Sequence, residues 1–158
     1  MAVPKSVIKL KKNGVVYTSN VDKCKYYIFE LSRAALRDVG KFCKKEFRKS
    51  FYSKFKRDTG DAGRATSCVV YSNKKTKFPR AEIGLPHSHR GKNVEGFYSY
   101  FQEVGSSRQP KLGILANVVQ SNVAEIIKIE SQYLSALETE ARVQQLISER
   151  EYRDDGDE

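Results

Sequence analysis

Residues 21–57 read VDKCKYYIFELSRAALRDVGKFCKKEFRKSFYSKFKR, and the pattern of this segment determines what the rest of the chain can pack against. It contains no proline and a single glycine, Gly40, and it follows Ser19 and Asn20, residue types that commonly cap the N-terminus of a helix. Apolar residues recur mostly every three or four positions, at Cys24, Ile28, Leu31, Ala35, Val39, Phe42, Phe47, Phe51 and Phe55. Because this is the spacing of one helix face, the pattern predicts a long amphipathic helix over 20–58.

The apolar stripe of this helix shifts near Gly40. A glycine in a helix interior costs about 1 kcal/mol relative to alanine, so we expect Gly40 to mark a bend. The run from Asp58 to Gly63 contains two glycines and is expected to end the helix.

The second half of the helix carries a basic face. Its cationic side chains are Lys41, Lys44, Lys45, Arg48, Lys49, Lys54, Lys56 and Arg57. With the rings of Phe51, Tyr52 and Phe55, these cations supply what a surface needs to follow a phosphate backbone. The rings repeat every four residues, however, which is core spacing, and the sequence carries no helix-turn-helix, zinc-finger or RNA-binding-sheet motif. Nonspecific nucleic-acid binding is therefore our second hypothesis, behind a role in protein interactions.

Two β-hairpins are predicted, one before the long helix in the sequence and one after it. In each, two β-prone runs flank a polar turn: 7–10 with 15–18 around Asn13-Gly14, and 66–71 with 79–85 around 72–77. Pro79 is expected at a strand start or edge, because proline cannot donate to a β-ladder. The polar run 86–96 is predicted to be a loop, and the aromatic segment 97–105 fits either a strand or a single helical turn.

A second long helix is predicted over 114–150, which contains neither proline nor glycine. Its apolar residues lie at helical spacing up to Leu137, and the acid-rich end, 151–158, is expected to be a disordered tail. We therefore predict a single α+β domain over 1–150. In it, two long amphipathic helices pack on a small, mainly antiparallel sheet, and a β-hairpin and loop region occupies 64–110.

The chain has 158 residues and a formal net charge of +10, but the charge is unevenly spread. Residues 1–78 hold 20 basic and 6 acidic side chains, a net of +14, whereas residues 79–158 hold 9 and 13, a net of −4. This asymmetry fits head-to-tail contact between copies, or two solvated surfaces that only keep the protein soluble. Charge alone favours the second explanation.

The sequence offers no targeting or membrane segment. No run approaches the roughly 20 apolar residues that cross a bilayer, so we expect no membrane partner. The N-terminus lacks the apolar segment of a secretory signal. Three widely spaced cysteines argue against a disulfide framework and fit synthesis in a reducing cytoplasm.

The sequence shows no pattern of catalytic residues. His87 and His89 are the only histidines, whereas a structural zinc site needs four ligands, and the cysteines form no Cys-x-x-Cys pair. Nucleophile elbows and phosphate-binding loops are also missing. Two of the glutamates Glu82, Glu95 and Glu103 could in principle act as an acid and a base, but nothing in the sequence indicates that their pKa values differ. We predict a non-catalytic protein without a cofactor or bound metal; a metal-dependent enzyme using the two histidines is the third hypothesis.

Short motifs stand between the helices. The first combines Thr59, Gly60, Arg64 and Ser67; the second combines Tyr98, Phe101, Glu103 and Gly105 and is followed by Pro110. With the order of the elements, these motifs resemble the tail-completion or head–tail joining proteins (minor tail components) of the neck of long-tailed bacteriophages. The resemblance covers roughly residues 20–140. Two departures are the extra residues before Arg64 and the Lys-Leu-Gly that follows Pro110.

The resemblance implies a virion structural protein that joins or completes the tail at the head–tail interface. It implies a ring subunit, in a hexameric ring of this chain, between the head connector or adaptor and the tail tube or tail terminator proteins, with DNA passing through. The protein would lie in the virion, and in the host cytoplasm during assembly. A closed ring joins two different surfaces of each copy, for which the hairpin at 66–85 and the loop at 86–96 are the expected docking elements. We expect Tyr98 and Phe101 to pack under this hairpin and Gly105 to adopt a backbone conformation reserved for glycine.

Overall fold

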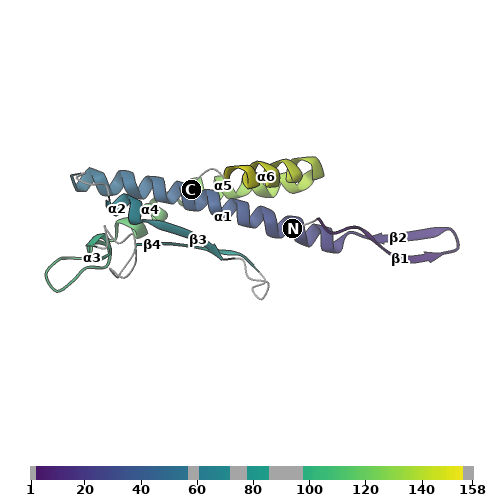
Figure 1. Ribbon diagram of the computed structural model, residues 1–158, viewed down its shortest axis with the longest axis horizontal. Helices are drawn as coiled ribbons and strands as arrows, with labels where there is room; N and C mark the ends of the chain where they lie inside the picture. Colours follow the sequence, from purple (N-terminus) through teal and green to yellow (C-terminus); the bar gives the residue numbers. More distant parts are fainter. Residues whose placement is uncertain (1–2, 57–60, 72–77, 86–97, 155–158) are drawn as a thin grey trace.

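The computed structural model describes residues 3–56, 61–71, 78–85 and 98–154, and it confirms an α+β fold (Figure 1). The elements in chain order are β1 (Val7–Lys12), β2 (Val15–Ser19), α1 (Val21–Lys54), α2 (Asp61–Ala65), β3 (Ser67–Tyr71), β4 (Arg80–Gly84), α3 (Tyr98–Val104), α4 (Ile114–Ser121), α5 (Val123–Ser135), the 3-10 turn η1 (Ala136–Glu138) and α6 (Glu140–Asp154).

Helix α1 is the axis of the molecule. It has 34 residues, so it is about 50 Å long. Figure 1 shows the β3–β4 hairpin along one side of α1 and the shorter helices α5 and α6 along another, while the β1–β2 hairpin extends beyond its N-terminal end. The β3–β4 hairpin and helices α4, α5 and α6 therefore pack on α1, whereas the β1–β2 hairpin does not.

Helix α1 buries different faces in its two halves. The N-terminal core cluster contains Tyr27, Leu31, Ala34 and Ala35 with Tyr133 and Val143; the C-terminal cluster contains Phe47 and Phe51 with Ala62, Ile114 and Val118. Twenty residues separate Tyr27 from Phe47, about five and a half turns, so these two side chains point to nearly opposite sides of the helix. The shift of the apolar stripe is therefore the change from one core cluster to the other.

Gly40 lies where α1 and β3 come very close. A Cβ atom on Gly40 would lie 2.1 Å from Sγ of Cys68 and 3.2 Å from its Cβ, so a larger residue would collide with the strand. The chain stays helical through Gly40. Close packing, rather than an interruption of the helix, explains this glycine.

Helix α1 ends earlier than predicted. Its last helical residue is Lys54, and Phe55 is extended, with φ −119° and ψ 132°. Residues 61–63, expected to be part of the stop, belong to the short helix α2, which runs to Ala65. The N–H of Gly63 donates to the hydroxyl oxygen of Tyr52 at 3.0 Å, which ties α2 to α1. Tertiary contacts therefore extend helical structure into a glycine-containing segment.

The prediction of one helix over 114–150 is wrong, because the chain breaks at Asn122 and Thr139. The side-chain Nδ2 of Asn122 donates to the carbonyl of Val118 at 2.8 Å, so the amide competes with the helical ladder. Thr139 is extended, and its carbonyl accepts hydrogen bonds from the backbone N–H groups of Arg142 and Val143 in the first turn of α6. Helix α6 runs to Asp154, so the part of the tail at 151–154 is helical, contrary to the expected disorder; 155–158 lie outside the described residues.

Both predicted hairpins are confirmed. Strands β1 and β2 pair antiparallel across Asn13 and Gly14, whose φ angles of 49° and 78° are typical of a tight hairpin turn. Strands β3 and β4 also pair antiparallel, and Pro79 directly precedes β4. In the described residues the two hairpins form separate two-stranded sheets, so the prediction of one small sheet is wrong. The segments predicted to be a turn, 72–77, and a loop, 86–96, lie outside the described residues.

Candidate interaction surfaces

The predicted basic face of α1 is smaller than the sequence indicated. Its members Lys41, Lys44, Lys45, Arg48 and Lys49 project within an arc of about 140° around the helix axis. Lys54 follows Lys45 by nine residues and therefore lies about half a turn away. Lys56 lies beyond the last residue of the helix, and Arg57 is outside the described residues. The face therefore contains five of the eight predicted cations.

A basic hollow lies between this face and β3. Arg37, Lys41 and Lys44 line it with three β3 residues, Cys68, Val69 and Val70, and its volume is about 390 Å³. Lys44 is half-buried, and burial, together with the nearby charge of Arg48, lowers the pKa of its ammonium group. The sequence prediction missed Arg37, although its spacing of four residues from Lys41 and seven from Lys44 places it on the same face.

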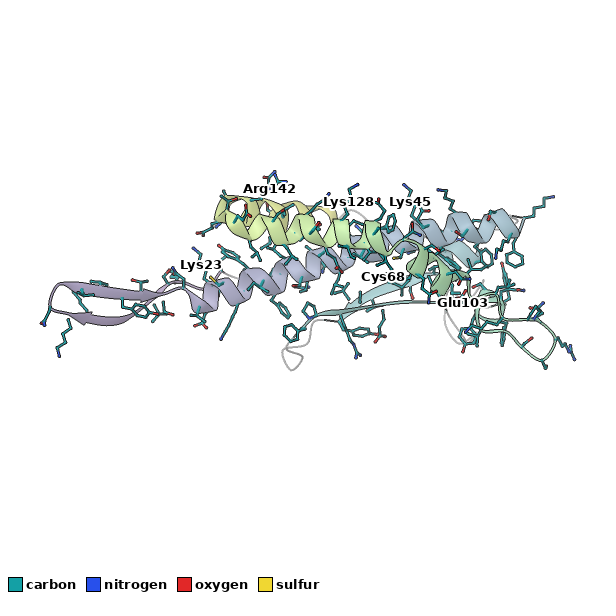
Figure 2. The ribbon with its side chains drawn as sticks, turned by 180° about the vertical axis from the view of Figure 1, so that it is seen from behind. Lys23, Lys45, Cys68, Glu103, Lys128 and Arg142 are labelled. Carbon is teal, nitrogen blue, oxygen red and sulfur yellow. The ribbon has the colours of Figure 1, made fainter. Side chains whose placement is uncertain are left out.

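Part of the basic face has a structural role. The Nε of Arg48 donates to the carbonyl of Gly63 at 2.9 Å, which holds α2 against α1. Lys49 forms an ion pair with Glu46 at 3.5 Å. Lys41 and Lys45 are exposed, and Figure 2 shows Lys45 pointing outward from α1. The face can contact an anionic partner, but its cations do not all project into solvent.

Glu103, the acid of the aromatic motif, caps α4. Its carboxylate oxygens accept hydrogen bonds from the backbone N–H of Leu115 at 2.9 and 3.1 Å and from that of Ala116 at 3.2 Å. The residue before α4, Gly113, provides no side-chain cap. A negative charge at this end also interacts favourably with the helix dipole. Glu103 therefore has an architectural role.

The glycine of the motif has the expected conformation. Gly105 ends α3 with φ +87°, and a Cβ there would lie 2.9 Å from the backbone nitrogen of Lys111. Two carbonyls near the end of α3, those of Gln102 and Glu103, accept from Leu112 and Gly113 at 3.0 and 3.2 Å. The exposed Pro110 lies in the same returning segment. Residues 98–113 thus form a compact clasp that leads into α4.

The aromatic residues of the motif are not packed as predicted. Tyr98 is 47% exposed and Phe101 is 40% exposed, whereas Ser99 between them is buried. The segment is helical, so Tyr98 and Phe101 share a face that turns toward solvent. Both are therefore surface residues, whereas the sequence prediction buried them under the second hairpin.

The other motif is only partly described. Thr59 and Gly60 lie outside the described residues. Arg64 is exposed on α2, and Ser67 begins β3, with its hydroxyl 3.5 Å from the carbonyl of Gly84. The sequence prediction passed over Thr66, which is fully buried and donates its hydroxyl to the carbonyl of Ala62 at 3.0 Å. In the described part of this motif, Arg64 lies in the last turn of α2 and Ser67 is the first residue of β3.

The β1–β2 hairpin exposes apolar side chains on both of its faces. Val15 is 62% exposed, Val16 is 51% exposed and Tyr17 is 57% exposed, although successive residues of a strand point to opposite sides. The base of the hairpin is tied down by Ser6, whose hydroxyl donates to the side-chain oxygen of Asn20 at 2.5 Å. Among the described elements, none packs extensively on either strand. A hairpin of two strands alone is marginally stable in water, so this one is suited to a binding partner.

An apolar trough lies between α1 and α5. Its lining residues are Ile28, Leu31, Ser32, Ala35, Leu36, Phe78, Pro79, Glu130, Tyr133, Leu134 and Leu137, and its volume is about 310 Å³. Leu134 is 66% exposed and Phe78 is 78% exposed. Ile28 and Leu137 also line a neighbouring hollow of about 340 Å³, so the apolar surface continues toward the N-terminal end of α1. Sequence periodicity placed Ile28 and Leu134 on core faces and did not reveal that they line an open trough.

A polar cluster braces the end of this trough. Lys23 lies 2.5 Å from Glu140, and the hydroxyl of Tyr27 donates to the same carboxylate at 3.0 Å. The hydrogen bonds from Lys23 and then Tyr27 hold the pKa of Glu140 below its usual range, while the hydrogen bond with Glu140 raises the pKa of Lys23. Tyr133 of α5 also donates a short hydrogen bond to Asp38 of α1. These contacts fix α5 and α6 on α1.

In the part of the chain that the structure describes, the candidate catalytic and metal-binding side chains do not form a common site. Within these ranges, no three His, Cys, Asp or Glu side chains lie where they could share a metal ion. His87, His89 and Glu95 lie outside them, and Glu82 forms a surface pair with Arg80 at 3.2 Å. Burial raises the pKa values of Cys43 and Cys68, whereas Cys24 is exposed. Across the described helices, none has the length and apolar character needed to span a bilayer.

Comparisons with known proteins found no relative of this chain. No family model, curated protein or solved structure matches the chain. Support for a function therefore comes from the surfaces described above and from the resemblance of the short motifs.

Proposed function

We propose that the protein is a non-catalytic structural subunit of a phage neck, which assembles with copies of itself into a ring and joins or completes the tail. The observation that carries this proposal is the presence of two different exposed apolar surfaces in one chain. One is the β1–β2 hairpin beyond the end of α1, and the other is the trough between α1 and α5. Apolar surfaces of this kind commonly bind other proteins.

Two unlike surfaces favour a ring over a simple dimer. A two-fold dimer uses the same patch on both copies, whereas a head-to-tail contact joins different patches and closes into a ring when the rotation allows. The motif that resembles the family also has an architectural role, since Glu103 and Gly105 hold the clasp before α4. The proposal includes six copies, a head connector or adaptor on one side and tail tube or tail terminator proteins on the other, in the virion after assembly in the host cytoplasm.

The test is removal of the gene from the phage that carries it. The proposal predicts that filled heads and finished tails accumulate separately, as counted by negative-stain electron microscopy, and that a plasmid copy restores joined particles. A matched control is a plasmid copy of an exposed-surface variant, Glu125→Gln, which should restore joining fully because Glu125 lies away from both apolar surfaces. Normal numbers of infectious particles without the protein would refute the proposal.

Nonspecific nucleic-acid binding is the second candidate, and the basic hollow favours it. Arg37, Lys41 and Lys44 surround a space next to two exposed cations, Lys45 and Lys49. Such a surface predicts binding that weakens steeply with salt, because each phosphate contact releases counterions. A titration of duplex DNA at low and physiological salt tests it. The reversal Lys41→Glu with Lys45→Glu should abolish binding, whereas Lys54→Glu, about half a turn away, should have a weaker effect.

A further inference from the structure

We propose that the β1–β2 hairpin of one copy binds in the apolar trough between α1 and α5 of the next copy. This inference rests on the proposed function and names the contact that joins neighbouring subunits. The occupant of the trough is a second copy of this chain. The trough does not need a small ligand or an unrelated protein in order to be covered.

The hairpin supplies a surface of suitable chemistry. Val15, Val16 and Tyr17 are all exposed, with Val15 and Tyr17 on one face of β2 and Val16 on the other, in the hairpin that extends beyond α1. The trough supplies the complementary surface, because Ile28, Leu134 and Phe78 are exposed around an apolar floor that includes Leu31. Each surface leaves apolar area in water that contact between them would bury, which favours association.

Charge complementarity points to the same pairing. Residues 1–19 contain four lysines and no acidic residue. Residues 123–140, which form one wall and the end of the trough, contain four glutamates and one lysine. Glu130 lines the trough itself, where a lysine of the incoming hairpin would find a partner. The uneven charge of the two halves of the sequence thus places a basic hairpin and an acidic trough wall on the two surfaces that we pair.

Direction favours a neighbouring copy over the same chain. Strand β1 has six residues and spans about 20 Å, while the trough wall from Glu130 to Leu137 extends about 10 Å, so the trough would hold roughly half the length of the strand. In Figure 1 the hairpin continues along the direction of α1, away from the trough of its own chain. The hydrogen bond between Ser6 and Asn20 holds its base in this position. The contact is therefore between different copies and joins unlike surfaces.

The test is cysteine cross-linking between copies of the full chain. In a Cys24→Ser background, one variant carries Tyr17→Cys on the hairpin and another carries Leu134→Cys in the trough; Cys43 is buried and Cys68 half-buried. The two variants are mixed and treated with a short bismaleimide cross-linker. We expect a cross-linked dimer from the mixture and little from either variant alone. The matched control replaces Leu134→Cys by Glu125→Cys, nine residues earlier and about half a turn around α5.

A second variant measures association without a cross-linker. Tyr17→Ser with Val15→Ser keeps the Asn13-Gly14 turn and should weaken self-association at least tenfold in sedimentation, with an unchanged helical circular dichroism signal. Equal cross-linking with Glu125→Cys, cross-linking of the hairpin variant to itself, or a chain that stays monomeric would overturn the inference. Oligomers unaffected by the hairpin variant would overturn it while leaving the ring proposal intact. Failure of the proposed function is detected separately, by normal particle assembly after removal of the gene.

Discussion

The contact between Gly40 and Cys68 allows a quantitative prediction. Replacing Gly40 by alanine in an unconstrained helix would stabilise the protein by about 1 kcal/mol. Here the new Cβ would lie 2.1 Å from Sγ of Cys68, so strand β3 or the thiol must move. Overpacking of this kind typically costs about 1–3 kcal/mol. We therefore expect Gly40→Ala to lower the free energy of unfolding by up to about 2 kcal/mol.

The same substitution should behave differently when the sulfur is absent. In a Cys68→Ala background, the nearest side-chain atom of residue 68 would be its Cβ, 3.2 Å away, so most of the collision is removed. Gly40→Ala should then be neutral or stabilising by up to about 1 kcal/mol, which gives a coupling energy of about 2 kcal/mol between the two sites. Urea denaturation of the four proteins, followed by circular dichroism, measures this cycle. An equal effect of Gly40→Ala in both backgrounds would refute the assigned contact between α1 and β3.

Three further predictions concern the clasp, the polar brace and the core. Glu103→Ala should destabilise the protein by about 1–2 kcal/mol in urea denaturation, and Glu103→Gln by less, because the amide oxygen still accepts a hydrogen bond from α4; equal stability of all three would contradict the cap. The lowered pKa of Glu140 means that its carboxylate stabilises the folded state above the unfolded pKa and that this contribution is lost as the pH falls through the folded pKa, which lies below the usual value of 4.5. Hydrogen exchange should therefore show α6 losing protection in acid, and Glu140→Gln should remove that pH dependence; unchanged dependence in the variant would argue against the brace. Phe47→Ala, at a fully buried position, should cost about 3–5 kcal/mol, whereas Tyr98→Ala should change the free energy of unfolding by less than about 0.5 kcal/mol; a large loss on Tyr98→Ala would restore a core role for the aromatic motif.

Local patterns in the sequence predicted the elements whose structure is set locally. Asn13 and Gly14 form the first hairpin turn because both accept positive φ, and the four-residue spacing of Phe47 and Phe51 marks a buried helix face. The shift of the stripe near Gly40 also had a physical meaning, since it separates the two core clusters. These features depend on residues close together in the chain.

Features that depend on distant residues were not predictable in the same way. The breaks at Asn122 and Thr139 occur without glycine or proline, and the side-chain amide of Asn122 takes a carbonyl of the preceding turn. Glu103 was noted in a motif, but its role as a cap on α4 became visible only when the returning segment placed α4 beside it. Tyr98 and Phe101 are exposed because the segment is helical, a choice that seven residues cannot settle by periodicity.

If this chain binds copies of itself in a phage neck, as we propose, cryo-electron microscopy of the neck in intact particles will show that assembly. Symmetry averaging should resolve a ring of six copies in which the hairpin beyond the N-terminal end of each long helix α1 contacts the helix pair of the neighbouring copy. A neck without density for this chain, or a chain present as single copies bound along DNA, would rule out this role.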